Sequence, residues 1–179
     1  MEIENKIPKS CKVVVIGGGV AGCSTTYHLA KYGWKDTVLL ERDVLTSGTT
    51  WHAAGLIGQL GSSATITKLR NYSLNLYKKL EEETGLSTGL KQNGSLTVAT
   101  TLDRLEELKR QLTFAQRFDI EARQVTNEEI KEIYPLINTE DLVGGVFIKK
   151  DGQADPVGVA NVMAKAARQN GATIIEKCP

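Results

Sequence analysis

Hydrophobic and polar positions along the first third of the chain predict a strand, a helix and a second strand. Residues 12–16, KVVVI, form a short β-branched run typical of a buried strand, and residues 37–40, TVLL, form another. Between them, residues 20–32 fit a helix, with Gly33 where a C-terminal cap is expected. This order of elements predicts an α/β fold.

The later part of the chain mixes further helices and strands. We expect helices at residues 64–83, 102–118 and 156–169, and strands at 95–100, 142–148 and 172–176. Thr126 and Glu129 have capping-box spacing for a short helix before Pro135, and Asp151-Gly152 reads as a turn. Because the last strand ends just before Pro179, we expect the chain to be the N-terminal part of a longer parent.

A long segment rich in Gly, Ser and Thr, residues 46–63, separates the second strand from the next helix. Loops of this length within a compact domain are usually functional. We therefore expect this loop to contribute to a site.

Composition excludes several classes of function. Charged residues make up 24% of the chain, the net charge is +1, and no basic run marks a nucleic-acid partner. The longest apolar runs are too short to span a bilayer. Three scattered cysteines and two histidines indicate reduced thiols and no metal centre. The N-terminus has no apolar core for secretion and carries two early Glu residues, so we expect a cytoplasmic protein, with the mitochondrial matrix as the alternative for a eukaryotic source.

The glycines after the first strand have the spacing of a dinucleotide-binding turn. Gly17 permits the tight turn, Gly19 lets the backbone approach a pyrophosphate, and Gly22 lets the helix pack on the strand. The helix N-terminus adds unpaired N–H groups and a partial positive charge. Glu41 ends the second strand, about 20 residues further on, where it can bind the adenosine ribose hydroxyls. The acid disfavours NADP, but the motif does not separate FAD from NAD, so a plain NAD-binding module stays open.

The residues that follow decide between FAD and NAD, because they resemble a known family. Residues 13–56, VVVIGGGVAGCSTTYHLAKYGWKDTVLLERDVLTSGTTWHAAGL, resemble the start of the sarcosine and dimethylglycine dehydrogenase family, which is related to D-amino-acid oxidase. The similarity continues through LEEETGLSTGLKQNGSLTVATT, EIYPLINTEDLVGGVF, DGQADP and NGATIIEKCP, and is sharpest at residues 47–56, SGTTWHAAGL. It implies an incomplete Rossmann-like FAD-binding domain of the D-amino-acid oxidase type, residues 1–179, with an inserted α+β portion.

The resemblance also implies the cofactor site. The residues expected to bind FAD are Gly17, Gly19, Val20, Ala21, Gly22, Glu41, Arg42, Gly48, Thr49, Thr50, Trp51, His52, Ala53, Ala54, Gly55 and Leu56. His52 maps onto the histidine that carries the flavin covalently in the family, and neutral imidazole is a competent nucleophile. Gly48, Ala53, Ala54 and Gly55 are small enough to pass close to a flat ring. Trp51 beside His52 could stack near the cofactor or fill the core, which is the commoner role for tryptophan.

The implied reaction is oxidation of an N-methyl group on a small glycine derivative, with hydrolysis or tetrahydrofolate capture of the one-carbon unit. The family places its substrate-binding groups and its folate-binding region further along the chain, so we name no catalytic residue and expect these 179 residues alone to be inactive. Sarcosine versus dimethylglycine, the electron acceptor and the oligomeric state stay open. A non-catalytic alternative is the related regulatory subunit of pyruvate dehydrogenase phosphatase, which lacks the histidine.

Overall fold

The computed structural model describes residues 7–179 and divides into two compact units. The first unit contains residues 7–55, 75–90 and 154–179. The second unit contains residues 56–74 and 91–153, which matches the expectation of an inserted portion. The long helix α2 (Ala64–Thr84) contributes residues 64–74 to the second unit and residues 75–84 to the first.

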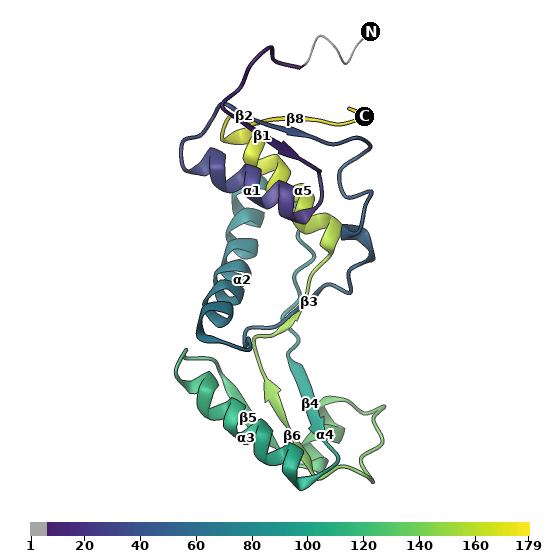
Figure 1. The fold of residues 1–179 in the computed structure, drawn as a ribbon. Helices are drawn as coiled ribbons and strands as arrows, with labels where there is room; N and C mark the ends of the chain where they lie inside the picture. The colour runs from purple at the N-terminus through teal and green to yellow at the C-terminus, as the bar shows by residue number, and fades with distance from the viewer. Residues whose placement is uncertain (1–6) are drawn as a thin grey trace. The chain divides into compact units, whose positions relative to one another are not determined.

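The first unit contains a three-stranded parallel sheet (Figure 1). The strands are β1 (Val13–Ile16), β2 (Thr37–Leu40) and β8 (Thr173–Ile175), in the order β1-β2-β8. Val13 lies opposite Thr37, and Val38 lies opposite Thr173. Strands joined through helices in this way form the Rossmann-like arrangement that the sequence predicts.

Two helices, α1 (Val20–Lys31) and α5 (Pro156–Gln169), pack on one face of this sheet (Figure 1). The buried positions of α1 recur at the spacing of one helix face: Cys23, Thr26, Tyr27 and Ala30. Most of the buried side chains of α5 are Ala or Val, so the two helices can approach closely. The opposite face of β1 is open to solvent among the described residues, with Ile16 86% exposed.

The ends of these helices follow from local sequence. Gly33 adopts a φ of +91° just after α1, as its predicted capping role requires. Asp155 caps α5 by accepting a hydrogen bond from the Val157 N–H at 3.0 Å, and Pro156 occupies the first turn. Gly171 closes the helix with a φ of +96°.

The second unit contains an antiparallel sheet of order β4-β6-β5. Its strands are β4 (Ser95–Ala99), β5 (Ala122–Val125) and β6 (Gly144–Ile148). Helix α3 (Leu102–Gln116) packs on it through a core of Ala99, Leu105, Leu108 and Val146. Helix α4 (Asn127–Ile133) begins with the predicted capping box of Thr126 and Glu129. Strand β5 was not predicted, because its sequence ARQV lacks an apolar pattern.

Two predictions about loops are wrong. The segment 46–63 is not loop throughout: it contains the 3₁₀ turn η1 (Thr50–His52) and strand β3 (Leu56–Ile57). Asp151-Gly152 is not a turn, because Gly152 begins β7 (Gly152–Gln153), which pairs with β3, and the turn lies at residues 149–150. A Cβ on Gly152 would lie 1.9 Å from the Lys91 carbonyl oxygen, so glycine is needed there for close approach of two chains.

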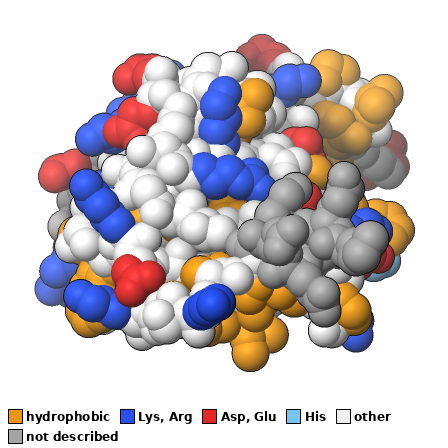
Figure 2. All heavy atoms as spheres, turned by 90° about the horizontal axis from the view of Figure 1, so that it is seen from above, with side chains coloured by type: hydrophobic (Ala, Val, Ile, Leu, Met, Phe, Trp, Pro, Cys, Tyr) orange, Lys and Arg blue, Asp and Glu red, His pale blue; other side chains and the backbone are white. Residues whose placement is uncertain are grey.

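Hydrophobic side chains also reach the surface. Seen from above, orange patches of such side chains lie among blue basic and red acidic ones (Figure 2). No helix within residues 7–179 combines the length and the apolarity needed to cross a membrane.

Candidate dinucleotide-binding site

The turn between β1 and α1 is built from glycines that each meet a different constraint. Gly17 has a φ of +102°, and its N–H donates to the Leu40 carbonyl at 2.8 Å. A Cβ on Gly22 would lie 1.9 Å from the Gly17 carbonyl oxygen, so only glycine lets α1 pack this closely. Gly18, which the sequence analysis passed over, is equally constrained, because a Cβ there would lie 2.5 Å from a methyl carbon of Leu45.

Electrostatics at this turn favour an anion. The N–H groups of the first helical turn have no intrahelical acceptors. That of Val20 donates to the Thr50 hydroxyl, whereas those of Ala21 and Gly22 meet no acceptor among residues 7–179. Among the described residues, a Cβ on Gly19 would touch only the Thr50 hydroxyl oxygen within 4 Å, so these residues leave the space beside the turn open. This cradle suits the pyrophosphate of a dinucleotide.

Glu41 is largely buried at the end of β2, and its carboxylate is held by backbone donors. One oxygen accepts the Asp43 N–H at 2.8 Å and the other accepts the Gly18 N–H at 2.6 Å. These two hydrogen bonds hold the pKa of Glu41 below its usual value of 4.5, the Asp43 bond contributing most. The carboxylate is therefore fixed beside the glycine turn in its charged form, and each oxygen keeps a second lone pair for a ribose hydroxyl.

The residues after β8 hold the end of β2 in place. The sequence analysis did not predict this role. The Glu176 carboxylate accepts the Leu45 N–H at 2.8 Å, and the Cys178 N–H donates to the Glu41 carbonyl at 2.9 Å. Lys177 forms an ion pair with Asp43. The signal that could have found these contacts is the polar run Glu176-Lys177 at the end of a strand of the same sheet.

Two further hydrogen bonds join the predicted attachment loop to the glycine turn. The Thr46 N–H donates to the Gly18 carbonyl at 3.0 Å, and the Val20 N–H donates to the Thr50 hydroxyl at 3.0 Å. Thr46 has a φ of +69°, a strained value for a β-branched residue. The loop is therefore held in one conformation against this turn.

His52 is exposed at the end of η1, and its ring lies against that of Trp51, with centroids 3.6 Å apart. Trp51 is 56% exposed, so the core-filling alternative for it is wrong. Ala53 and Ala54 are exposed as well, and a Cβ on Gly48 would touch nothing within 4 Å. Gly55 differs, because a Cβ at this position would lie 2.1 Å from the Ala154 carbonyl oxygen. Only glycine therefore allows the backbone to lie this close to Ala154.

The remaining residues predicted to bind FAD are exposed. Arg42 and Val20 are exposed beside the turn. Leu56 begins β3 in the second unit and is 79% exposed, whereas all other predicted residues belong to the first unit.

Burial raises the pKa of the Cys23 thiol to about 11, so Cys23 stays protonated and acts as a packing residue.

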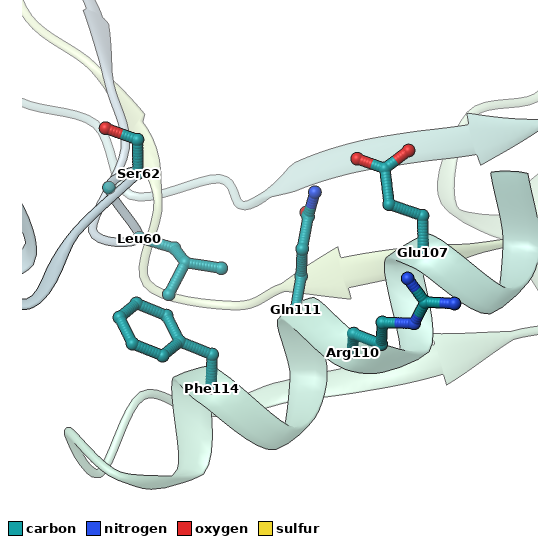
Figure 3. A pocket seen from close by; sticks show the side chains of 7 residues that line it. Leu60, Ser62, Glu107, Arg110, Gln111 and Phe114 are labelled. Atoms are coloured by element: carbon teal, nitrogen blue, oxygen red, sulfur yellow. The ribbon is translucent and has the colours of Figure 1, made fainter.

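The second unit contains a separate hollow of about 430 Å³. Phe114, Arg110 and Glu107 of α3 line one side, and residues 60–62 line the other (Figure 3). The Glu107 carboxylate pairs with Arg104 at 2.5 Å. None of the residues predicted to bind FAD lines this hollow.

Comparison with known proteins identifies the family. The family described as FAD dependent oxidoreductase matches residues 12–179. The chain is 46% identical over 174 residues to human mitochondrial sarcosine dehydrogenase and 40% identical over 179 residues to human mitochondrial dimethylglycine dehydrogenase. It is also 39% identical over 171 residues to the mouse mitochondrial regulatory subunit of pyruvate dehydrogenase phosphatase. These alignments cover 97%, 100% and 96% of this chain, but only 19%, 21% and 20% of the relatives, so the chain spans about a fifth of their length.

A solved structure confirms the fold class. L-proline dehydrogenase from P. horikoshii superposes with a TM-score of 0.88 at 30% sequence identity, over 96% of this chain and 45% of that one. The open cradle at Gly19 and the fixed carboxylate of Glu41 fit the pyrophosphate and ribose of FAD. The chain belongs to the family of FAD-dependent oxidoreductases.

Proposed function

We propose that this chain is the FAD-binding part of an amine dehydrogenase that oxidises an N-methyl group of a small glycine derivative. The substrate class follows from the names of its relatives, sarcosine dehydrogenase and dimethylglycine dehydrogenase. The observation that carries the proposal is the loop of residues 46–54, which is hydrogen-bonded to the glycine turn and presents an exposed histidine.

Each part of the site has a proposed task. The turn at Gly17–Gly22 binds the pyrophosphate together with the N–H groups of Ala21 and Gly22, which have no acceptor among residues 7–179. Glu41 binds the adenosine ribose with the lone pairs that its backbone donors leave free. Arg42 and residues 48–56 line the rest of the cofactor. Bound FAD would supply the hydride acceptor for this oxidation.

We propose further that His52 bonds covalently to the flavin. His52 would hold the flavin through one imidazole nitrogen, which would act as the nucleophile and give up its proton. The flavin would supply the carbon that is attacked and the acceptor for the two electrons released, with an oxidant such as dioxygen taking them up afterwards. Exposure of His52 on a loop with small neighbours supports this role, because the ring is open to approach. The Trp51 ring, which lies tilted against that of His52, limits the positions that the imidazole can take.

The regulatory alternative has a specific observation in its favour, which is the 39% identity to a phosphatase regulatory subunit. His52 favours the enzyme, because the resemblance implies that the regulatory branch lacks this residue. A plain NAD-binding module is disfavoured by the family match along residues 12–179. The mammalian relatives are mitochondrial by name, which favours the mitochondrial alternative over the predicted cytoplasmic location for a eukaryotic source. The N-methylated substrate, the electron acceptor and a role for tetrahydrofolate belong to the complete enzyme.

The test is made on the complete protein, produced in cells supplied with riboflavin, because this chain spans only about a fifth of the length of its relatives. We expect a yellow protein with flavin absorption, and flavin fluorescence in the protein band after denaturation in acid and electrophoresis. His52→Ala should abolish the in-gel fluorescence. His28→Ala, which removes the other of the two histidines, should keep it. Fluorescence that survives His52→Ala would leave non-covalent FAD, whereas a colourless wild-type protein would contradict the flavin site itself.

A further inference from the structure

Thr50 is buried within a loop whose neighbouring residues are exposed. It is 7% exposed, whereas residues 47–49 and 51–54 all lie in solvent. A threonine hydroxyl that is largely removed from water needs a hydrogen-bond partner. The partner in this case is the Val20 N–H, 30 positions away in sequence, at 3.0 Å.

This bond supplies a helix cap that the local sequence lacks. Val20 is the first residue of α1, and the residue at the N-cap position is Gly19, which has no side chain to accept a hydrogen bond. Threonine is among the residues preferred for this task, although usually from the cap position itself. Thr50 therefore accepts from one of the unpaired N–H groups at the start of α1, as an N-cap side chain does in other helices, although here the donor is the first helical residue.

The glycine at position 19 makes room for this arrangement. A Cβ on Gly19 would lie 3.0 Å from the Thr50 hydroxyl oxygen, and no other atom of the part of the chain that the structure describes would lie within 4 Å of that Cβ. The same loop is attached at a second point, where the Thr46 N–H donates to the Gly18 carbonyl at 3.0 Å. Two hydrogen bonds therefore fix the loop to successive parts of the glycine turn, and His52 follows two residues after the second of them.

We propose that Thr50 is a positioning residue that fixes the loop bearing His52 onto the N-terminus of α1. It thereby sets the geometry between the attachment residue and the phosphate-binding turn. The cap itself concerns only residues of this chain, while its effect on flavin attachment rests on the proposed function. This role differs from the direct cofactor contact that the sequence predicts for Thr50, because its hydroxyl acts on the protein backbone.

The first experiment uses the chain without added cofactor and measures backbone amide exchange by NMR. Thr50→Val removes the hydroxyl but keeps the shape, so the Val20 amide should exchange about fivefold faster, as expected for loss of a cap worth about 1 kcal/mol. Amides of residues 47–54 should also exchange faster. Thr50→Ser should restore most of the protection. Thr25→Val, the same change on the exposed surface of α1, should leave Val20 unaffected.

The second experiment introduces the same changes into the complete protein and measures flavin binding and attachment. If Thr50 positions His52, Thr50→Val should slow covalent attachment more than it weakens FAD affinity, and Thr50→Ser should recover the rate. Unchanged exchange at Val20 in Thr50→Val would overturn the cap. Faster exchange with an unchanged attachment rate would overturn the positioning role and leave the flavin site intact. A complete wild-type protein that binds no flavin would contradict the proposed function, while the exchange data would still decide whether Thr50 caps α1.

Discussion

At the scale of single residues, the site combines a fixed charge with a strained backbone. Glu41 keeps its charge because two backbone N–H groups donate to it, and both belong to segments that shape the site. Thr46 adopts a positive φ that costs energy for a β-branched residue, and its N–H bond to Gly18 holds it there. Strain of this kind persists only where surrounding contacts determine the conformation, which is consistent with a loop held for binding.

Glu41 should make the stability of the protein depend on pH. Its pKa in the folded state is lowered from 4.5, so its contribution to the free energy of unfolding is present above pH 4.5 and is lost as the pH falls through the folded value. The difference in stability between wild type and Glu41→Gln should therefore shrink as the pH falls below 4.5, as measured by urea unfolding at several pH values. Glu140→Gln, at an exposed carboxylate, controls for loss of a charge. A difference that stays constant with pH would contradict the assignment.

Gly22 should tolerate no side chain. The Cβ of Gly22→Ala would lie 1.9 Å from the Gly17 carbonyl oxygen, so α1 must move away from β1. We expect a loss of about 1–3 kcal/mol in the free energy of unfolding, as is typical of overpacking. Gly48→Ala is the matched control, because a Cβ there meets nothing within 4 Å. Equal stability of the two variants would show that α1 does not need this close contact.

At the scale of elements, the sequence predicted those with strong local patterns. Helices α1, α2, α3 and α5 and strands β1, β2, β4, β6 and β8 all appear close to their expected bounds. The missed strands are short, and their pairing depends on distant partners: Leu56 of β3 pairs with Gln153 of β7, and the polar β5 pairs with β6. The two-residue strands β3 and β7 and the polar strand β5 carry too little hydrophobic pattern to identify, and their partners are chosen by tertiary structure.

Asp151 organises the strand pair β3–β7 in the second unit. Its buried carboxylate accepts the Gln59 N–H at 2.7 Å and the Ser95 hydroxyl at 2.6 Å, and thereby joins the end of β3 to the start of β4. Asp151→Ala would leave both donors without this acceptor, which costs about 1–3 kcal/mol for each donor left buried. We expect faster amide exchange at Gln59 and a lower urea midpoint. Asp141→Ala, at an exposed position of the same unit, should change neither.

At the scale of the whole molecule, the glycine turn, the Glu41 carboxylate and the His52 loop all belong to the first unit. The sequence predicted these residues because the spacing of the glycine motif and the resemblance to the family can both be read from the order of residues along the chain. It could not predict the bond between Val20 and Thr50, or the attachment of Leu45 to Glu176, since these join segments 30 and 131 positions apart. Contacts of this kind follow from the packing of the first unit and carry no local signature.

The two units have separate cores, and we expect each core to be destabilised separately. Leu108 of the second unit and Leu39 of the first are both fully buried. Truncation of either to Ala should cost about 2–5 kcal/mol through lost burial and the cavity left behind. Amide exchange measured by mass spectrometry should show Leu108→Ala accelerating residues 95–148 while the glycine turn stays protected. Leu39→Ala should show the reverse. Uniform acceleration across residues 7–179 in either variant would mean that the two cores unfold as a single cooperative unit, and the flavin site would then depend on the packing of α3 against its sheet.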